Sequence, residues 1–519
     1  MKLVKFSLIP PIVAISALFV SLCACGATQR YVSKDGSYGA DVEGAKCYTT
    51  LQAAVAAAGK GDTIWVQDGF ECTPKDGYAA YDANGFATIS ITNAASLTIR
   101  GKTGNWETGP VIRGSSELGV RCIYAPRKNP TNTNIDGLTL IGLRLEDGYV
   151  KDSNGGGLYT SDRKNIVVTN CFIANCGARY GGGAWGTYIT MYQSVVSNCF
   201  VLSSGYGAGT VNLTAIDTTY IKNTGAAFYV TGNNNKTALR CKMIDNSSTG
   251  CYSNPNDSYK ATVRDCVFKS NAGGGVYGKA DVSNCVFISN SAEKGAGVAA
   301  YLKSSTLLPQ SVVCTDCVFS NNTATSMGSV GWYGKFINCR MEHNAVTGTT
   351  GTGTRLGQGT LYGSSAYNSL IANNTSMRKG GGIYVVGACE LVNCTVVSNA
   401  SVNGATIDGD GAAGSTLTLV NTIFAKNSAT APDIATSATT CFFDSDGDPK
   451  LVKAGKEFAF WPKPNSPCIG TGTVLEWMSD ETDARSKDLA GLPRLTDGKV
   501  NIGCYEGIAP MPGLLLLLR

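Results

Sequence analysis

Histidine, charged residues and long apolar runs are all scarce in this chain of 519 residues. The single histidine, His343, lies in the stretch Arg-Met-Glu-His-Asn, and charged residues make up only 16% of the chain. A histidine base needs catalytic partners close by, so a solvated turn residue is the favoured interpretation of His343. Outside the N-terminus, no apolar run reaches the roughly 18 residues that predict a membrane-spanning helix.

Positive charge is too sparse to predict a nucleic-acid partner. Residues 1–27 contain Lys2 and Lys5 but no acid, so the rest of the chain carries 41 basic side chains, two fewer than the total of 43, against 38 acidic ones. The resulting net charge of +3 is small, and Lys and Arg form no dense cluster. Both observations argue against nucleic-acid binding.

Glycine and cysteine are abundant, with 63 and 20 residues, and many of the cysteines belong to an eleven-copy repeat between Asn170 and Asn427. The template of the copies is Asn or Asp, a small residue, any residue, a large apolar residue, two residues of any type, then Asn. The small position is taken by Cys171, Cys199, Thr218, Cys241, Cys266, Cys285, Cys317, Cys339, Ser369, Cys394 and Thr422. The large position is taken by Ile173, Val201, Tyr220, Met243, Phe268, Phe287, Phe319, Met341, Ile371, Val396 and Phe424. Asn closes every copy except the first two, which have Cys176 and Ser204.

This spacing predicts a stack of β-strands. The small and large positions are two residues apart, so on a strand both side chains point to one face. Copies lie 19 to 32 residues apart, which is typical of a solenoid. Glycine-rich stretches such as 181–183, 273–275 and 380–382 predict tight turns into a second strand. A leucine-rich repeat is the rival solenoid, but leucine is scarce at the buried positions.

We therefore predict an all-β fold, namely a single-stranded right-handed parallel β-helix solenoid of about thirteen to fifteen coils, spanning residues 85–440. Residues 28–84 are predicted to form an N-terminal cap and first strand. Within the cap, Leu51, Ala54, Val55 and Ala58 share one helical face that Thr49 or Thr50 can cap, and Thr63 to Val66 read as a strand. Such a short helix would cover the open first coil.

Residues 1–27 read as a secretory signal, with two lysines, an apolar stretch and small residues. Leu22-Cys23-Ala24-Cys25-Gly26 resembles a bacterial lipobox, which implies lipidation at Cys25. The alternative is ordinary cleavage after the small residues that follow. Either way we expect an exported protein, at the cell surface or outer membrane or free outside the cell, and held to a membrane only through a lipid anchor.

Three segments resemble known families. The cap at 31–68 resembles that of secreted β-helix proteins of the pectate-lyase-like superfamily, and the repeats resemble those of polymorphic outer-membrane proteins. Residues 441–507 resemble the C-terminal cap of the choice-of-anchor Q family, through Asp448-Pro449, 466–472, Gly491-Leu492-Pro493-Arg494 and 501–506. Cys468 and Cys504 stand where that family has Ala, and the matched departures imply a disulfide between them. A tail follows at 508–519.

The remaining cysteines and acids give weaker candidate sites. Stacked in register, the repeat cysteines have poor disulfide geometry, so a ladder of buried thiols is expected. Cys47 and Cys72 near the cap form a second disulfide candidate. Asp408 and Asp410, and Asp444, Asp446 and Asp448, place acids two apart in glycine-containing loops, which suits calcium or, equally, a structural turn. Apart from this structural calcium, no cofactor is predicted.

The functional interpretation favours binding over catalysis. Neither a stacked acidic patch nor a lyase or polygalacturonase signature is evident, although tyrosine and tryptophan often follow the glycine corners, as Tyr159, Trp185, Tyr277 and Tyr384 do. These rings would either stack on sugars or pack in the core. We predict a monomer that serves adhesion or glycan binding, with extracellular polysaccharide or a host or neighbouring cell surface as its partner. The alternative is a polysaccharide lyase or glycoside hydrolase, which converging acids or bases on adjacent coils would favour, whereas a groove lined by Tyr, Asn and Thr would favour binding.

Overall fold

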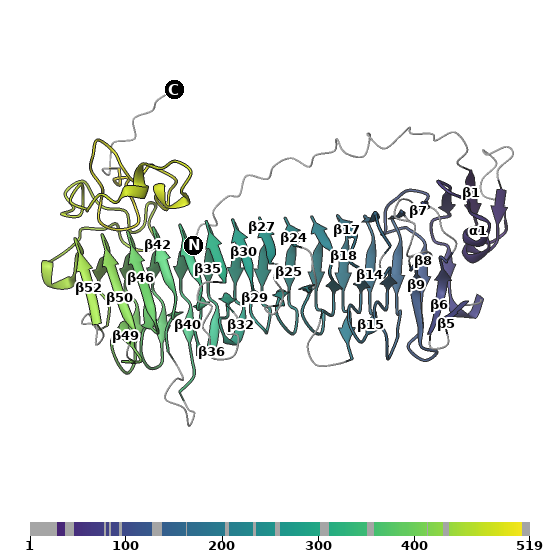
Figure 1. The fold of residues 1–519 in the computed structure, drawn as a ribbon, viewed down its shortest axis with the longest axis horizontal. Coiled ribbons are helices and arrows are strands. Elements are labelled where there is room, and N and C mark those ends of the chain that lie inside the picture. The colour runs from purple at the N-terminus through teal and green to yellow at the C-terminus, as the bar shows by residue number, and fades with distance from the viewer. Residues whose placement is uncertain are drawn as a thin grey trace.

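The structure, a computed structural model, describes residues 28–36, 46–76, 79–82, 85–92, 96–126, 137–161, 163–202, 207–231, 235–254, 260–300, 311–349, 358–412, 414–428 and 435–510. The described strands stack into one elongated right-handed parallel β-helix, which confirms the predicted fold class (Figure 1). The signal sequence with Cys25, and tail residues 511–519, lie outside the described residues. Among the described residues, no helix is long and apolar enough to cross a membrane.

Three long sheets, A, B and C, run along the molecule. Sheet A contains β2 (Lys46–Tyr48), β1 (Gln29–Val32), β3 (Thr63–Val66), β7 (Leu97–Gly101), β10 (Leu138–Ile141), β13 (Ile166–Thr169), β17 (Ile189–Tyr192), β21 (Thr214–Ile216), β24 (Lys236–Leu239), β27 (Ala261–Arg264), β30 (Ala280–Ser283), β34 (Val312–Thr315), β38 (Lys335–Ile337), β42 (Ser365–Tyr367), β46 (Ala388–Val392), β50 (Thr416–Val420) and β52 (Ala435–Thr439). Sheet B contains β4 (Glu71–Cys72), β8 (Val111–Arg113), β11 (Arg144–Glu146), β14 (Phe172–Ala174), β18 (Val195–Ser197), β22 (Thr219–Ile221), β25 (Lys242–Ile244), β28 (Val267–Lys269), β31 (Val286–Ile288), β35 (Val318–Ser320), β39 (Arg340–Glu342), β43 (Leu370–Ala372), β47 (Thr395–Val397) and β51 (Ile423–Ala425). Sheet C contains β5 (Ala79–Asp82), β6 (Gly85–Ser90), β9 (Val120–Tyr124), β12 (Leu158–Tyr159), β16 (Ala184–Trp185), β20 (Thr210–Val211), β23 (Phe228–Val230), β26 (Cys251–Ser253), β29 (Val276–Gly278), β33 (Val298–Ala299), β37 (Gly331–Trp332), β41 (Leu361–Tyr362), β45 (Ile383–Val385) and β49 (Ile407–Gly409).

Each coil runs from sheet A to sheet B and then to sheet C. Short extra strands lie between B and C, namely β15 (Gly177–Ala178), β19 (Phe200–Val201), β32 (Ser291–Lys294), β36 (Thr323–Met327), β40 (Ala345–Val346), β44 (Thr375–Ser376) and β48 (Ala400–Ser401). The 14 strands of sheet B, one per coil, agree with the predicted number of coils. Because neighbouring strands in a sheet lie about 4.8 Å apart, equivalent residues of successive coils stack at that spacing.

The small position of the repeat serves both packing and hydrogen bonding. Its side chain points inward and donates to the carbonyl oxygen two residues earlier, as Cys285 Sγ does to Ser283 at 3.1 Å and Ser369 Oγ does to Tyr367 at 2.8 Å. Cys, Ser and Thr all supply a small side chain with such a donor, so they exchange freely. The repeat cysteines are buried and free, which confirms the expected ladder of thiols.

The strand register corrects the second copy of the repeat. Pairing of β14 with β18 gives Ser194 the small position and Val196 the large one. Cys199 was predicted at the small position, but it lies beside Cys176, where later coils have the closing Asn. The prediction was wrong because Cys199-Phe200-Val201 has the same spacing of a small and a large apolar residue. Phe200 and Val201 belong to the short strand β19, whereas the true copy lies on the preceding strand, β18.

The closing asparagines form a buried ladder. Nδ2 of Asn290 donates to Oδ1 of Asn322 at 2.9 Å, and Oδ1 of Asn290 accepts from both N and Nδ2 of Asn271, at 3.1 and 2.9 Å. The left-handed backbone of each corner occurs not at this Asn but at the preceding residue and at the opening residue of the copy, as at Ser289 (φ 55°) and Asn284 (φ 52°). The closing Asn is therefore selected for its amide rather than for its backbone.

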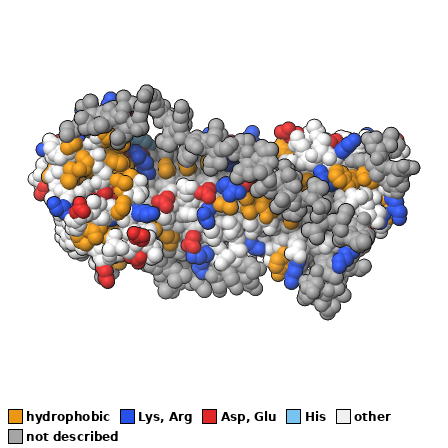
Figure 2. Space-filling view, turned by 90° about the horizontal axis from the view of Figure 1, so that it is seen from above, with side chains coloured by type: hydrophobic (Ala, Val, Ile, Leu, Met, Phe, Trp, Pro, Cys, Tyr) orange, Lys and Arg blue, Asp and Glu red, His pale blue; other side chains and the backbone are white. Residues whose placement is uncertain are grey.

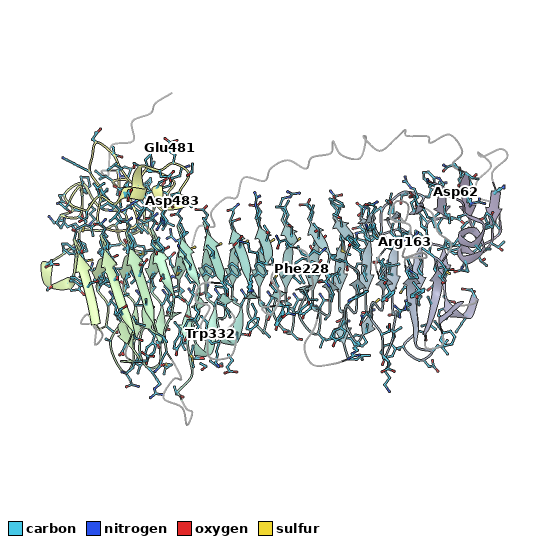
Figure 3. The ribbon with its side chains drawn as sticks, viewed as in Figure 1. Asp62, Arg163, Phe228, Trp332, Glu481 and Asp483 are labelled. Atoms are coloured by element: carbon cyan, nitrogen blue, oxygen red, sulfur yellow. The ribbon has the colours of Figure 1, made fainter. Side chains whose placement is uncertain are left out.

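The large apolar positions fill the interior. Phe287 stacks between Phe268 and Phe319, with ring centroids 4.8 and 4.6 Å apart. Phe228, labelled in Figure 3, belongs to the same continuous core. Like residues stack on like because parallel strands in register bring the same position of each coil together.

The N-terminal helix α1 (Leu51–Ala57) covers the first coil as predicted. Thr50 caps it by accepting from the backbone N–H of Ala53 at 3.3 Å, and the helix buries Leu51, Ala54 and Val55. No other α-helix occurs among the described residues, and the returns of the coils are strands, which excludes the leucine-rich repeat that has helical returns.

A buried ion pair joins this cap to the first strands. Oδ2 of Asp62 accepts from Nε of Arg30 and from the backbone N–H of Gly59, and Oδ1 accepts from the N–H of Thr28, all at 2.8 Å. Burial alone would raise the pKa of Asp62, but these donors together lower it below the ordinary value. Asp62 lies at the N-terminal end of the molecule in Figure 3.

The C-terminal segment, residues 449–510, packs against the side of the last coils (Figure 1). Ile502, Cys504 and Tyr505 join one apolar cluster with Leu370 of β43 and Ile423 of β51, on the outer face of sheet B. The segment contains two 3-10 turns, η3 (Glu476–Ser479) and η4 (Ala484–Ser486), and a third, η2 (Asp444–Asp446), comes just before it. The expected cap thus covers a lateral face of the coils.

A second asparagine ladder docks this segment. At the opening position of the repeat, the coils under the segment have Asn338, Asn368, Asn393 and Asn421, linked amide to amide. Nδ2 of Asn368 also donates to the carbonyl oxygens of Arg485 and Lys487, at 2.8 and 2.7 Å. The coils under the segment all have Asn at this position, whereas the uncovered coils have various residues there, namely Asn170, Gln193, Asp217, Arg240, Asp265, Asn284 and Asp316.

Arg494 organises the segment from within. Its guanidinium is fully buried, donates to the carbonyl oxygens of Gly503 and Asn501 at 3.0 and 3.1 Å, and pairs with Glu506 at 3.0 Å. The Gly-x-Pro-Arg motif therefore supplies a structural arginine. Gly470 and Asn501 of this segment are also hydrogen-bonded, since the N–H of Gly470 donates to Oδ1 of Asn501 at 2.8 Å.

Candidate functional site

The first pair of calcium candidates, Asp408 and Asp410, lies on β49 and in the loop that follows it, and one oxygen of each carboxylate has partners within the protein. Oδ1 of Asp410 accepts from the N–H of Ala412 at 3.0 Å and from Oγ of Ser415 at 2.7 Å. Asp408 is buried and lies 3.2 Å from Nζ of Lys379, a cation that competes with any metal ion. The loop therefore has the geometry of a turn.

The second acidic loop is similar. Asp444, Asp446 and Asp448 each accept a backbone N–H group at 2.8 or 2.9 Å. In the part of the chain that the structure describes, no three Asp, Glu, His or Cys side chains are placed to hold a metal ion. Calcium at either loop stays a prediction that lacks a preformed site there.

Neither predicted disulfide is formed in the structure. Cys47 lies exposed on β2 of sheet A while Cys72 is buried on β4 of sheet B, and both are free. Cys468 and Cys504 are free as well, and they fill small apolar positions in the cluster beneath the C-terminal segment. Burial raises the pKa of the Cys468 thiol to about 11 and that of Cys504 to about 12, so both are protonated at neutral pH.

Charged side chains do converge on adjacent coils near the N-terminus, but they neutralise one another. Arg113 on β8 contacts Glu71 at 2.7 Å, Glu146 at 2.9 Å and Asp147 at 2.5 Å. Arg144 also forms an ion pair with Glu146, with 2.6 Å between a guanidinium nitrogen and Oε1. Every carboxylate of this group is occupied by an arginine, which suits an ion-pair network between coils rather than a substrate site. His343 is exposed at a corner with φ of 59°, as expected.

The aromatic residues after the glycine corners face outward from sheet C. The register places Tyr124, Tyr159, Trp185, Val211, Tyr229, Tyr252, Tyr277, Ala299, Trp332, Tyr362 and Tyr384 in one row, each following an inward residue. Their rings stack face to face, for example Tyr159 on Trp185 at 5.1 Å and Tyr252 on Tyr277 at 5.0 Å. The ring faces that would contact a sugar are thus covered by neighbouring rings.

The glycine corners explain why aromatic residues occur there. A Cβ on Gly380 would lie 2.9 Å from Cβ of Tyr384, and one on Gly181 would lie 3.0 Å from Cβ of Trp185. Only glycine lets the corner pass this close to the ring-bearing residue. The rings thus pack on one another along sheet C, and Tyr362 and Tyr384 are buried as part of the continuous core.

The outer face of sheet A presents a different row, which we call the threonine row. Strand pairing aligns Thr63, Thr98, Thr139, Val167, Thr190, Thr214, Thr237 and Thr262 across successive coils. All eight are half-buried side chains that alternate with inward core residues. Val has the shape of Thr, so the row is one continuous line of β-branched side chains.

Two exposed tyrosines flank the threonine row. Tyr188, Thr190 and Tyr192 point to the same face because they are two residues apart on one strand. Tyr188 is 41% exposed and Tyr192 is 37% exposed, among the most exposed aromatic residues of the described chain. Thr190 therefore lies between two tyrosines whose side chains are exposed to solvent. We call these three residues the tyrosine saddle.

A buried lysine supports the saddle from inside the coil. Lys236 takes the inward position of β24, is 7% exposed, and donates from Nζ to the carbonyl oxygen of Thr187 at 2.5 Å. Burial lowers the pKa of this ammonium group. The bond links Lys236 of β24 to Thr187, which lies 49 residues earlier in the chain and directly precedes Tyr188.

Beyond Thr262 the row becomes charged. The next positions are Asp281, Val313, Lys335, Ser365 and Glu390. Asp281 pairs with Lys260, Glu390 accepts from Oη of Tyr367, and Lys335 lies 4.9 Å from the centre of the Tyr367 ring. Asp483 and Arg485 of the C-terminal segment stand beside this group (Figure 3). In Figure 2, described apolar, basic and acidic side chains intermingle over this end of the molecule.

Sequence reasoning missed the threonine row, although a signal for it exists. From Val167 to Glu390 the row residue stands four positions before the small residue of the repeat, as Thr237 does before Cys241 and Thr262 before Cys266. The repeat was aligned only over its strand in sheet B, so the preceding strand in sheet A was left unaligned.

Comparison with known proteins supports the fold. A family model described as "Right handed beta helix region" matches residues 112–309, and no curated protein matches the chain. Solved structures similar to this chain include pectate lyase Pel9A, with 12% identity, 92% of this chain and 96% of that chain covered, and a TM-score of 0.25. The mannuronan C-5 epimerase AlgE6 A-module of Azotobacter vinelandii is 10% identical, with 76% and 93% covered and a TM-score of 0.29. The Agl-KA catalytic domain is 13% identical, with 75% and 64% covered and a TM-score of 0.37. The chain is thus similar in sequence, over residues 112–309, to the right-handed β-helix family.

Proposed function

We propose that this protein is an exported β-helix that binds glycans through the outer face of sheet A, and so attaches to extracellular polysaccharide or to a cell surface. The observation that carries the proposal is the threonine row with its tyrosine saddle. It is a line of half-buried β-branched side chains, seven of them threonines, with two exposed tyrosines beside it.

The chemistry of this face suits sugars. A hydroxyl group both donates and accepts, as sugar hydroxyls do, and the threonine methyl groups and tyrosine rings can cover the apolar C–H face of a pyranose. Each β-branched side chain is restricted to few rotamers, so little conformational entropy is lost on binding. Many weak contacts along the row would then add up to useful affinity.

A second candidate function is cleavage of the bound chain, by a lyase or glycoside hydrolase mechanism. It is favoured by the group at the end of the row, where the hydrogen-bonded pair of Tyr367 and Glu390 lies beside Lys335 on an adjacent coil. A carboxylate, a phenol and an ammonium group could share proton transfer. The ion pairs around this group make binding the better supported function.

The test is retention of the purified protein on immobilised neutral and acidic polysaccharides, with product release followed in parallel. We expect Thr214→Lys, which places a long charged side chain on the row, to weaken retention about tenfold. Thr219→Lys is the matched control, since it makes the same change in the same coil on the outer face of sheet B. Equal loss in both variants, or no retention of the wild type, would refute the proposal. Product release would establish the second candidate.

A further inference from the structure

We infer, resting on the proposed function, that the ligand of the threonine row is an uncharged, extended polysaccharide that lies parallel to the helix axis with about one sugar for each coil. Three features of the row point to this ligand: its direction, its charge and its length.

The direction follows from the register. Residues of the row are neighbours across strands, so the line that joins them runs perpendicular to the strands and along the axis of the solenoid. Successive hydroxyl groups are about 4.8 Å apart, the spacing of parallel strands. That distance is close to the length of one pyranose unit in an extended chain. A polymer along the row would therefore meet the same contact at each coil.

The charge follows from what flanks the row. Between Arg100 on β7 and Arg264 on β27, the second outward position of sheet A is Ile141, Thr169, Tyr192, Ile216 and Leu239, all uncharged. The row itself is uncharged from Thr63 to Thr262. A polymer with a carboxylate on each sugar would lose hydration along this surface without gaining a cation on each coil. An uncharged chain has no such cost.

Two cations near the row have their own contacts. The guanidinium of Arg100 lies 4.1 Å from the centre of the Trp65 ring, on the neighbouring strand. Nζ of Lys164 lies 5.8 Å from the centre of the Tyr188 ring. These cations stand at the margin of the row rather than on it, so they do not supply a repeating anion site.

The length follows from the number of coils. The row from Thr63 to Thr262 crosses eight strands, β3, β7, β10, β13, β17, β21, β24 and β27, and Asp281 with its partner Lys260 ends it. A chain of about eight sugars would occupy every position of the row. Longer chains would gain nothing further from the row.

Binding of a graded series of oligosaccharides tests this inference. The series runs from disaccharide to decasaccharide for neutral gluco-, xylo- and manno-oligosaccharides, with oligogalacturonates and oligomannuronates of equal length. We expect affinity for at least one neutral series to rise about tenfold or more from disaccharide to octasaccharide and then to level off. The acidic series should bind at least about tenfold more weakly at equal length.

Variants at the centre and the end of the row sharpen the test. Thr190→Lys in the saddle should weaken binding of short and long chains alike. Thr262→Lys should leave short chains unaffected and move the plateau to shorter lengths, whereas Thr219→Lys on sheet B should change neither. Affinity that does not depend on length, or preference for the acidic series, would overturn the inference while leaving glycan binding intact. If polymers and oligomers of both kinds all fail to bind, the proposed function itself is wrong.

Discussion

A side chain on an inner ladder contributes much more to the stability of the fold than a chemically similar side chain on the surface. Asn290 is fully buried and takes part in bonds to the coils on both sides, whereas Asn284, six residues earlier, is exposed. Removing a buried amide leaves donors and acceptors in two neighbouring coils without partners. The two asparagines of one repeat copy are therefore not interchangeable.

We predict that Asn290→Ala lowers the free energy of unfolding by about 3 kcal/mol, because several buried polar groups lose their partners. Asn284→Gly should change it by less than about 0.5 kcal/mol, since glycine accepts the left-handed backbone of that exposed residue. Denaturant unfolding of both variants measures the difference. Similar losses in the two variants would show that the ladder amide is not the source of stability.

Particular residues also show how much of the structure could be predicted from the sequence. The inward ladders were predictable because a two-residue spacing assigns side chains to a face wherever the copies align. Cys199 was misplaced because one coil has an extra short strand that imitates the template. The pairing of Cys468 with Cys504 came from a family resemblance alone, and in the structure both thiols are free. The threonine row depends on contacts between coils, which only the register of sheet A supplies.

At the scale of elements, the N-terminal cap depends on one buried ion pair. The lowered pKa of Asp62 means that its carboxylate stabilises the fold above the ordinary Asp pKa, and that this contribution is lost as the pH falls through the lower folded value. Below that pH the protonated side chain no longer pairs with Arg30.

We therefore expect the cap to loosen in acid before the central coils do. Asp62→Asn should destabilise the cap by about 3 kcal/mol at neutral pH and should remove most of the acid dependence, because one partner of a buried pair is lost. Limited proteolysis within residues 28–66 across a pH series would follow this. Asp76→Asn, at an exposed carboxylate that bonds only to Thr73 in the described structure, is the control. An unchanged pH profile in Asp62→Asn would contradict the assignment.

The C-terminal segment is a second element whose docking depends on a few amides. We predict that Asn368→Asp weakens docking by about 2–4 kcal/mol, since a carboxylate would face the carbonyl oxygens of Arg485 and Lys487. Faster proteolysis within 475–487 would report the release. Asp316→Asn changes the same position in an uncovered coil and should have no effect, so release in both variants would count against the asparagine ladder as the docking device.

At the scale of the whole molecule, stability in a solenoid is set by contacts between neighbouring coils. Central strands such as β31 pair on both sides, whereas β2 and β52 end sheet A among the described strands. The two ends differ, because α1 covers the first coil across its end and the C-terminal segment covers the last coils along their side. Opening should therefore begin at the ends and progress inward.

Hydrogen exchange should reveal this order. We expect amide protection to be highest in β25, β28, β31 and β35 and to fall towards both ends, since opening a central coil breaks two interfaces and opening an end coil breaks one. In Asn368→Asp, protection should fall in β43, β47 and β51, which the C-terminal segment covers, while β14 and β18 keep theirs. The threonine row lies on the coils that this variant leaves protected, so glycan binding should persist when the segment is released. If binding were lost with the segment, the ligand would lie at the charged group of Lys335, Tyr367 and Glu390 instead, because among the described residues this is the end of the face that touches the segment.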